Sequence, residues 1–197
     1  MSTKIYVEGG GNQKRTVTAC RIAFGKYFEK VVPYGMRPQI IACGSRDQAY
    51  KDFKKDLDDP RYDRVLLLVD AEDQVAVGDD GWQHLRRRDK WIKPNRARQN
   101  AAHLMVQCME SWFLADKSCL KTFYDQGFNE KALPKRKEIE LILKKDVSAG
   151  LENATKYTQK GLYHKTRHGF DILALIDPKK VEAVSRFAAQ LHKCVLE

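Results

Sequence analysis

The sequence has no long hydrophobic run. Its two longest apolar stretches, Val65–Val69 and Ile172–Ile176, have five residues each, whereas a helix that crosses a bilayer needs about 20. The first eight residues already include a lysine and a glutamate, so the apolar core of a secretory signal has no room to form. We therefore expect no membrane role and no signal peptide, and a cytoplasmic location.

Cysteine is sparse, and several well-known motifs are missing. The cysteines are odd in number, and none forms a Cys-x-x-Cys or Cys-x-x-His arrangement, which argues against a zinc ribbon and a disulfide framework. They are Cys20, Cys43, Cys108, Cys119 and Cys194. We expect a reducing compartment with most of these thiols in the core. Neither the P-loop nor the dinucleotide fingerprint is present, so the chain carries no ATPase motif of its own.

Positive charge, by contrast, is in excess. There are 36 lysines and arginines against 26 acids, a formal net charge of +10, which favours a polyanionic partner such as nucleic acid. Cations are dense in residues 84–98 and 153–170, which suits phosphate contacts, and Trp91 would be available to stack on bases. The expected phosphate contacts are Arg86, Arg87, Arg88, Lys90, Lys93, Arg96, Arg98 and Arg167. Solvated loops that only aid solubility are the alternative interpretation.

The order of apolar segments predicts an α/β fold. Strands are expected over 4–7, 39–43 and 64–69, with helices over 13–29 and 45–57 between them. The strands are continuously apolar, which indicates burial on both faces, as in a parallel sheet. With 102–107 as a fourth strand, we expect a Rossmann-like parallel four-stranded sheet with helices on both faces.

The length of 197 residues favours a single domain over 1–197. Its sheet core would occupy 1–116, and 74–100 would be a basic insertion, too long for a simple connection and therefore functional. The remainder, 117–197, would be a mainly helical extension. Helices are expected to begin in 109–115 and to cover 135–145, 146–159 and 177–196.

Acidic residues follow two of the predicted strands. Glu8 ends the first strand before three glycines, and Asp70, Glu72 and Asp73 follow the third. Ligands of parallel sheets bind at the carboxyl ends of the strands, and carboxylates gathered there repel one another unless a cation lies between them. Oxygen ligands suit Mg²⁺ or Mn²⁺. Taken singly, each acid would be a helix cap or a loop residue. Acids that point apart, or that arginine and lysine already neutralise, would contradict a metal site and with it any nuclease function.

The residues Ile5–Gly10 and Leu68–Asp73 together resemble the toprim (topoisomerase–primase) pattern, in which a glutamate ends the first strand and Asp-x-Asp ends the third. The resemblance is closer to toprim-like nucleases of bacterial defence, namely the OLD group and small stand-alone relatives encoded beside an ATPase. The stretches Gln107–Asp116 and Tyr163–Gly169, followed by Ile172–Ile176, are also similar to those relatives. This chain departs from the pattern because it has Asp-x-Glu, and the extra methylene of glutamate moves the carboxylate.

The resemblance also implies roles for particular residues. The residues implied to be catalytic are Glu8, Asp70, Glu72 and Lys165, the last by neutralising charge on the scissile phosphate; a plain surface lysine is the alternative. The implied Mg²⁺ ligands are Glu8, Asp70 and Glu72, with Asp73 adjacent and Glu110 completing a second metal position. Candidate acid–base or phosphate contacts are His103, His164 and His168.

The hypothesis that follows is a metal-dependent nuclease that cleaves phosphodiester bonds of DNA or tRNA. The resemblance adds that it is the effector of an antiphage defence system with an ATPase partner. One alternative is a non-catalytic nucleic-acid-binding or regulatory subunit of an ATPase complex, whose acids are structural. A phosphatase or nucleotidyl hydrolase that acts on small phosphates is another. Assembly of several copies into a homo-oligomer stays open.

Overall fold

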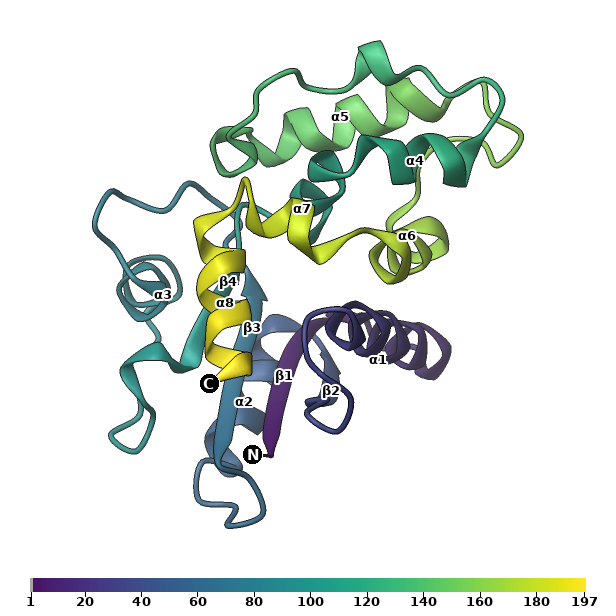
Figure 1. Ribbon diagram of the computed structural model, residues 1–197. Helices are drawn as coiled ribbons and strands as arrows, with labels where there is room; N and C mark the ends of the chain where they lie inside the picture. Colours follow the sequence, from purple (N-terminus) through teal and green to yellow (C-terminus); the bar gives the residue numbers. More distant parts are fainter. Residues whose placement is uncertain (1) are drawn as a thin grey trace.

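Four short runs of aliphatic residues form the strands of one parallel sheet in the computed structural model, which describes residues 2–197. The strands are β1 (Thr3–Gly10), β2 (Gln39–Gly44), β3 (Arg64–Asp70) and β4 (Ala102–Met105). Their order is β2-β1-β3-β4, and every neighbouring pair is parallel. The predicted α/β class, with its Rossmann-like four-stranded parallel sheet, is therefore confirmed (Figure 1).

The strands are apolar without alternation because both faces of the sheet are covered. Ile5 on the central strand β1 pairs in register with Ile40 on β2 and Leu66 on β3, and all three side chains are buried. Burial on both sides is what distinguishes such strands from the half-exposed strands of an antiparallel sheet. The core of the molecule lies along this sheet.

Helices cover both faces, as predicted. On one face lie α1 (Lys14–Glu29) and α8 (Arg186–Leu196), joined by a 3.0 Å hydrogen bond between Tyr27 Oη and His192 Nε2. On the other lie α2 (Arg46–Lys55) and α3 (Gly81–Asp89), whose Phe53 and Trp82 rings have centroids 5.8 Å apart. This double covering is the usual solution for a parallel sheet.

The remaining helices lie mainly beyond the end of the sheet at which the strands finish (Figure 1). They are α4 (Lys117–Tyr124), α5 (Lys144–Thr155), α6 (Phe170–Leu175) and α7 (Pro178–Glu182). Because ligands of parallel sheets bind at this end, the helical layer faces the candidate site. None of the helices within residues 2–197 is both long enough and apolar enough to cross a membrane.

Several predicted elements differ in detail from the structure. The stretch 74–100, expected to be a basic insertion, contains the helix α3, which was not predicted from the sequence and which buries Trp82 and Leu85. The helix expected over 135–145 is a loop with a short 3₁₀ turn at Ile139–Leu141, and the one expected from 109 is the 3₁₀ segment Met109–Ala115. The helix expected over 177–196 is divided into α7 and α8, because Ser185 caps a new helix.

Candidate metal centre

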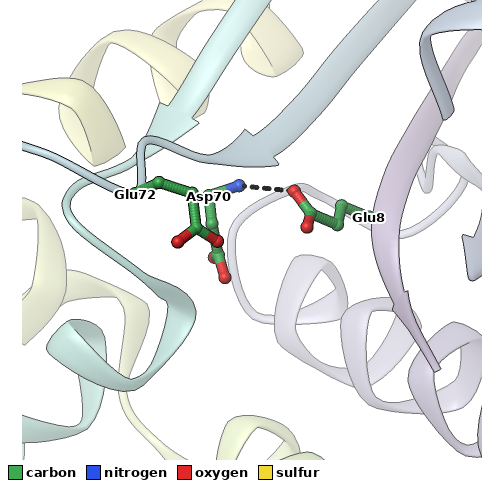
Figure 2. A group of neighbouring side chains, drawn as sticks. All are labelled: Glu8, Asp70 and Glu72. Carbon is green, nitrogen blue, oxygen red and sulfur yellow. Dashed lines mark hydrogen bonds between the residues drawn. The ribbon is translucent and has the colours of Figure 1, made fainter. Parts of the chain in front are cut away.

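Three acidic side chains from distant parts of the sequence converge where β1 and β3 end. Glu8, Asp70 and Glu72 each offer a carboxylate oxygen, and these oxygens lie within 4.8 Å of one another (Figure 2). The parallel register of β1 and β3 produces this arrangement, since it brings Val7 beside Leu68 and the following residues to the same edge. The sequence prediction that these acids meet is confirmed.

Glu8 is fixed in place from two sides. Its Oε2 accepts a hydrogen bond from the Asp70 amide at 3.2 Å and another from the Arg46 guanidinium at 3.2 Å. The chain can turn sharply just after Glu8 only because of glycine: Gly10 has φ +90°, and a Cβ there would lie 2.6 Å from the backbone of Val17. Glycine readily adopts such a conformation and allows this close approach.

Asp70 is the most deeply placed of the three, with a side chain that is only 4% exposed. Its Oδ1 accepts a 2.7 Å hydrogen bond from the Met109 amide, and its Oδ2 lies 3.4 Å from the Lys165 ammonium. Burial raises the pKa of Asp70 to about 7, and the charges of Glu110 and Glu8 add to the rise while Lys165 opposes it. The protein therefore holds this carboxylate ionised only at a cost.

Glu72 has an unusual backbone conformation for a non-glycine residue, with φ +69°. Its amide donates a 2.7 Å hydrogen bond to the carbonyl of Gln107, and its Oε2 accepts one from the Lys144 ammonium. Burial raises the pKa of Glu72, but the Lys144 hydrogen bond and charge outweigh that effect, so the net shift is downward. A left-handed residue that is held by its neighbours is common at functional sites.

Glu110 lies beside the triad, and its two oxygens differ. Oε1 accepts a 3.0 Å hydrogen bond from the Tyr163 hydroxyl and lies 3.6 Å from the Lys165 ammonium. Oε2 is buried and has no partner in the part of the chain described. A buried carboxylate oxygen without a donor is costly, so this atom is suited to a bound cation or to a donor on a substrate.

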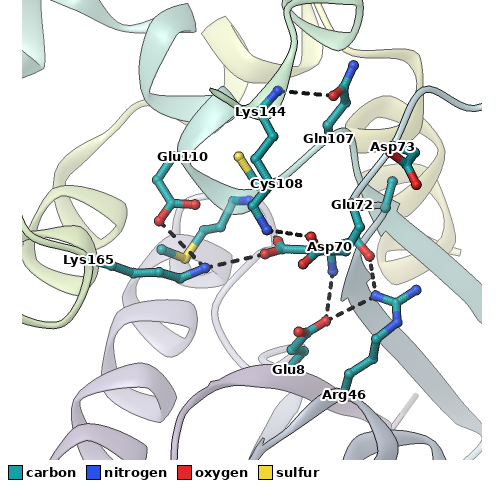
Figure 3. A network of polar contacts seen from close by, with 12 residues as sticks. Glu8, Arg46, Asp70, Glu72, Asp73, Gln107, Cys108, Glu110, Lys144 and Lys165 are labelled. Atoms are coloured by element: carbon teal, nitrogen blue, oxygen red, sulfur yellow. Dashed lines mark hydrogen bonds and ion pairs between the residues drawn. The ribbon is translucent and has the colours of Figure 1, made fainter. Parts of the chain in front are cut away.

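Arginine and lysine side chains already contact all of these acids (Figure 3). Arg46 joins Glu8 to Asp89, and Arg88 extends the network to Asp73. This pairing is the feature that the sequence hypothesis named as contrary to a metal site and to a nuclease, and it counts against both. Neutralisation is nevertheless incomplete, because the network contains six carboxylates and four cations, which leaves a formal charge of −2. The carboxylates are those of Glu8, Asp70, Glu72, Asp73, Asp89 and Glu110, and the cations are Arg46, Arg88, Lys144 and Lys165.

The residues present therefore fit a hard divalent cation on three observations. Their oxygens converge, the network has two negative charges to spare, and Glu110 Oε2 has no partner. Glu8, Asp70 and Glu72 would hold such an ion, because carboxylate oxygens are the ligands that Mg²⁺ and Mn²⁺ prefer. The ammonium groups of Lys144 and Lys165 would then have to turn from these acids toward a substrate.

The other acids and histidines have different surroundings. Asp73 is 76% exposed, lies 3.6 Å from Arg88 and is not part of the converging triad. His103 is buried in β4, and His168 is buried against Tyr124, whose hydroxyl lies 3.1 Å from His168 Nδ1. His164 is exposed and lines a cavity beside the triad.

The predicted phosphate contacts are exposed except for Lys93, which is half-buried. Arg86, Arg87 and Lys90 line a cavity of about 520 Å³ at the end of α3, and the ion-pair network connects this helix to Glu8 through Asp89 and Arg46. Trp91 is different, because it is 9% exposed and stacks on Tyr50 at 4.3 Å between ring centroids. The expectation that Trp91 stacks on bases is therefore wrong: its ring is part of the core.

Sequence reasoning missed two cations that contact the acidic triad, Arg46 and Lys144. Arg46 had a signal, because it follows the second strand and so lies at the same edge of the sheet as Glu8 and Asp70. Lys144 had none, because it approaches Glu72 from a helix 72 residues away in the sequence.

Comparison with known proteins gives one match. A family described as a domain of unknown function, DUF4276, matches residues 7–193. Comparisons with the curated proteins and with the solved structures give no significant match.

Proposed function

We propose that this chain, which belongs to the DUF4276 family, is a metal-dependent nuclease that hydrolyses phosphodiester bonds of nucleic acid. The observation that carries the proposal is the convergence of Glu8, Asp70 and Glu72 within 4.8 Å at the carboxyl edge of a parallel sheet. The toprim-like resemblance supports its finer parts, which are a DNA or tRNA substrate, a defence role and an ATPase partner.

The reaction requires water to attack phosphorus while the bond to one ester oxygen breaks, leaving a phosphate monoester and a hydroxyl. A bound Mg²⁺ or Mn²⁺ would supply an activated water and offset charge at phosphorus. The protein's own contribution is positional: the Asp70 amide and Arg46 orient Glu8, and the Met109 amide orients Asp70. Lys165 is suited to contact the phosphate because its acidic neighbours outweigh the effect of burial and raise its pKa, which keeps the ammonium charged.

Glu8→Gln and Asp70→Asn test the proposal. We expect each to lower the Mg²⁺-dependent cleavage rate at least about 100-fold, because each removes a charged ligand worth several kcal/mol in the transition state. Cleavage would be assayed on plasmid DNA and on total tRNA, and Mn²⁺ affinity by calorimetry. Asp73→Asn is the matched control and should retain both activity and Mn²⁺ binding, because Asp73 is exposed and outside the triad.

Folding of the variants can be checked independently. Because burial raises the pKa of Asp70 to about 7, the stability that its protonated form contributes is lost as the pH rises through that value. Asp70→Asn removes this buried charge, so its melting temperature above pH 7 should be no lower than that of the wild type. Full cleavage by folded Glu8→Gln and Asp70→Asn would contradict the nuclease assignment.

A second candidate function is favoured by the ion pairs themselves. If Arg46, Lys144 and Lys165 remain on their acids, the site is structural and the chain is a non-catalytic nucleic-acid-binding subunit. That reading predicts no Mn²⁺ binding and no turnover, together with nucleic-acid binding that weakens steeply with salt. The calorimetric measurement on the wild type therefore separates the two candidates.

A further inference from the structure

A cavity of about 350 Å³ opens directly beside the acidic triad. One wall is a single face of α5, formed by Lys144, Ser148 and Glu152, which are spaced four residues apart and so lie in line. The remaining lining residues belong to two other segments of the chain: Tyr163, His164 and Lys165, and Cys108 and Glu110. Lys144 and Lys165, which line the cavity, are also the residues that contact Glu72 and Asp70 (Figure 3).

Hydrogen-bond donors and acceptors occupy different parts of this cavity. Ammonium groups lie where it meets the triad, and they are suited to phosphate oxygens. Acceptors occur elsewhere in the lining: Glu152, whose carboxylate lies 3.3 Å from the Ser148 hydroxyl, and Glu110, whose Oε2 is buried without a donor. A nucleotide has the complementary pattern, because its phosphate is anionic and its sugar and base carry hydroxyl and N–H donors.

The acidic side chains lie in a recess, and this limits which substrates can reach them. The side chains of Asp70 and Glu110 are only 4% and 8% exposed, so a scissile phosphate must enter the recess rather than lie across an open surface. The cavity volume is near the lower end of the roughly 300–1,000 Å³ typical of small-molecule sites. A nucleotide inside it cannot remain paired and stacked in a duplex, and unpairing costs a few kcal/mol.

We propose that this cavity receives one unpaired nucleotide next to the scissile phosphate, so that the substrate is single-stranded nucleic acid or an unpaired segment of a folded one. The inference rests on the proposed nuclease function and specifies its substrate. Lys144 and Lys165 contact the phosphate of the bound nucleotide, and Glu110 and Glu152 accept hydrogen bonds from its sugar or base.

Ser148→Trp tests the inference, because Ser148 is exposed on α5 and a large ring there fills the cavity without disturbing the core. Ala149→Trp is the matched control, since Ala149 is also exposed on α5 but does not line the cavity. Fluorescein-labelled single strands of RNA and of DNA, and their duplexes, would be titrated by anisotropy in EDTA and again in Ca²⁺. Cleavage of the same strands would be followed in Mg²⁺.

We expect the wild type and Ala149→Trp to bind a single strand at least about tenfold more tightly than its duplex, which corresponds to 1.4 kcal/mol, and Ser148→Trp to lose this preference. Comparison of the RNA and DNA strands shows whether the cavity prefers ribose or deoxyribose. A preference for the single strand over its duplex in either case supports the inference. Equal binding of duplex and single strand in both buffers, or an unchanged preference in Ser148→Trp, would overturn it. A different result would contradict the nuclease proposal alone. If the Glu8→Gln and Asp70→Asn variants remain active while the preference for single strands still depends on the cavity, the metal-site assignment is wrong and the cavity assignment stands.

Discussion

His103 lies on β4, where an imidazole can be held only in its neutral form. The residue is 5% exposed, its Nε2 has no partner within residues 2–197, and burial lowers its pKa from 6.5 to about 4. The unfolded chain therefore takes up a proton between pH 6.5 and about 4 that the folded chain excludes. Stability that is present above this window is lost as the pH falls through it.

We expect His103→Leu to reduce this acid sensitivity. The wild type should lose up to about 3 kcal/mol more than the variant across the window, at 1.36 kcal/mol per pKa unit. Urea denaturation at the two ends of the window measures the difference. His164→Leu, which replaces an exposed histidine, is the control. Identical acid sensitivity in the wild type and His103→Leu would show that His103 titrates normally.

At the level of single residues, the sequence predicted the acids better than their environment. Glu8 and Asp70 could be placed because each ends a strand, and parallel strands bring their carboxyl ends to one edge. Asp73 follows the same strand, yet its side chain turns outward to Arg88. The burial of Trp91 against Tyr50 was equally hidden, because contacts between distant segments are not encoded in local spacing.

Among the helices, α6 has an end that depends on another helix. The Lys30 ammonium, just after α1, donates hydrogen bonds of 2.8, 2.9 and 2.9 Å to the carbonyls of Ala174, Leu175 and Ile176. A cation at this position satisfies carbonyls that have no partner within the helix and interacts favourably with its negative end. The segment that leads into α6 carries Lys165, so this cap helps to hold one side of the candidate site.

We expect Lys30→Met to destabilise the end of α6 by about 1–2 kcal/mol, because three charge-assisted hydrogen bonds are lost from a partly exposed position. Hydrogen exchange followed by mass spectrometry should show faster exchange in residues 170–176. Lys26→Met is the matched control, since Lys26 lies in the last turn of the same helix and is exposed. If both variants exchange at the wild-type rate, the Lys30 contacts do not stabilise α6.

Whole elements were predictable where hydrophobic pattern and capping agreed. The helix α2 satisfies both conditions, since Ser45 caps it and Ala49 and Phe53 form its buried face, and the strands have a clear pattern that needs no cap. The helix α3 was not predicted from the sequence, because arginines dominate it. Its signals were present: Asp80 and Gln83 form a capping box, and Trp82 and Leu85 lie three residues apart on its buried face. The divided helix over 177–196 shows the converse, since Ser185 was a cap within a pattern that looked continuous.

At the scale of the molecule, the C-terminal part completes the sheet region instead of standing apart from it. Contacts between the two parts include the Lys30 cap on α6, the Tyr27–His192 hydrogen bond and a 2.6 Å hydrogen bond from Arg64 to the carbonyl of Cys194. The site itself combines acids of the sheet with Lys144 and Lys165 of the later helices. The sequence predicted the α/β class but not this interlocking, because no local pattern specifies which helix covers which strand end.

We therefore expect the chain to unfold as one cooperative unit. Removing residues 117–197 would uncover the face of α1 that packs on α6 and the side of β4 that packs on α8, both of which carry buried apolar residues, so the fragment 1–116 should not fold alone. In the full chain, far-UV circular dichroism and tryptophan fluorescence should give coincident urea transitions. The two probes report on different regions, since all three tryptophans lie within residues 1–116, whereas far-UV circular dichroism also follows the helices α4 to α8 of residues 117–197. Two separated transitions, or a fragment 1–116 with native-like dispersion in its NMR spectrum, would show instead that the sheet region is an independent domain.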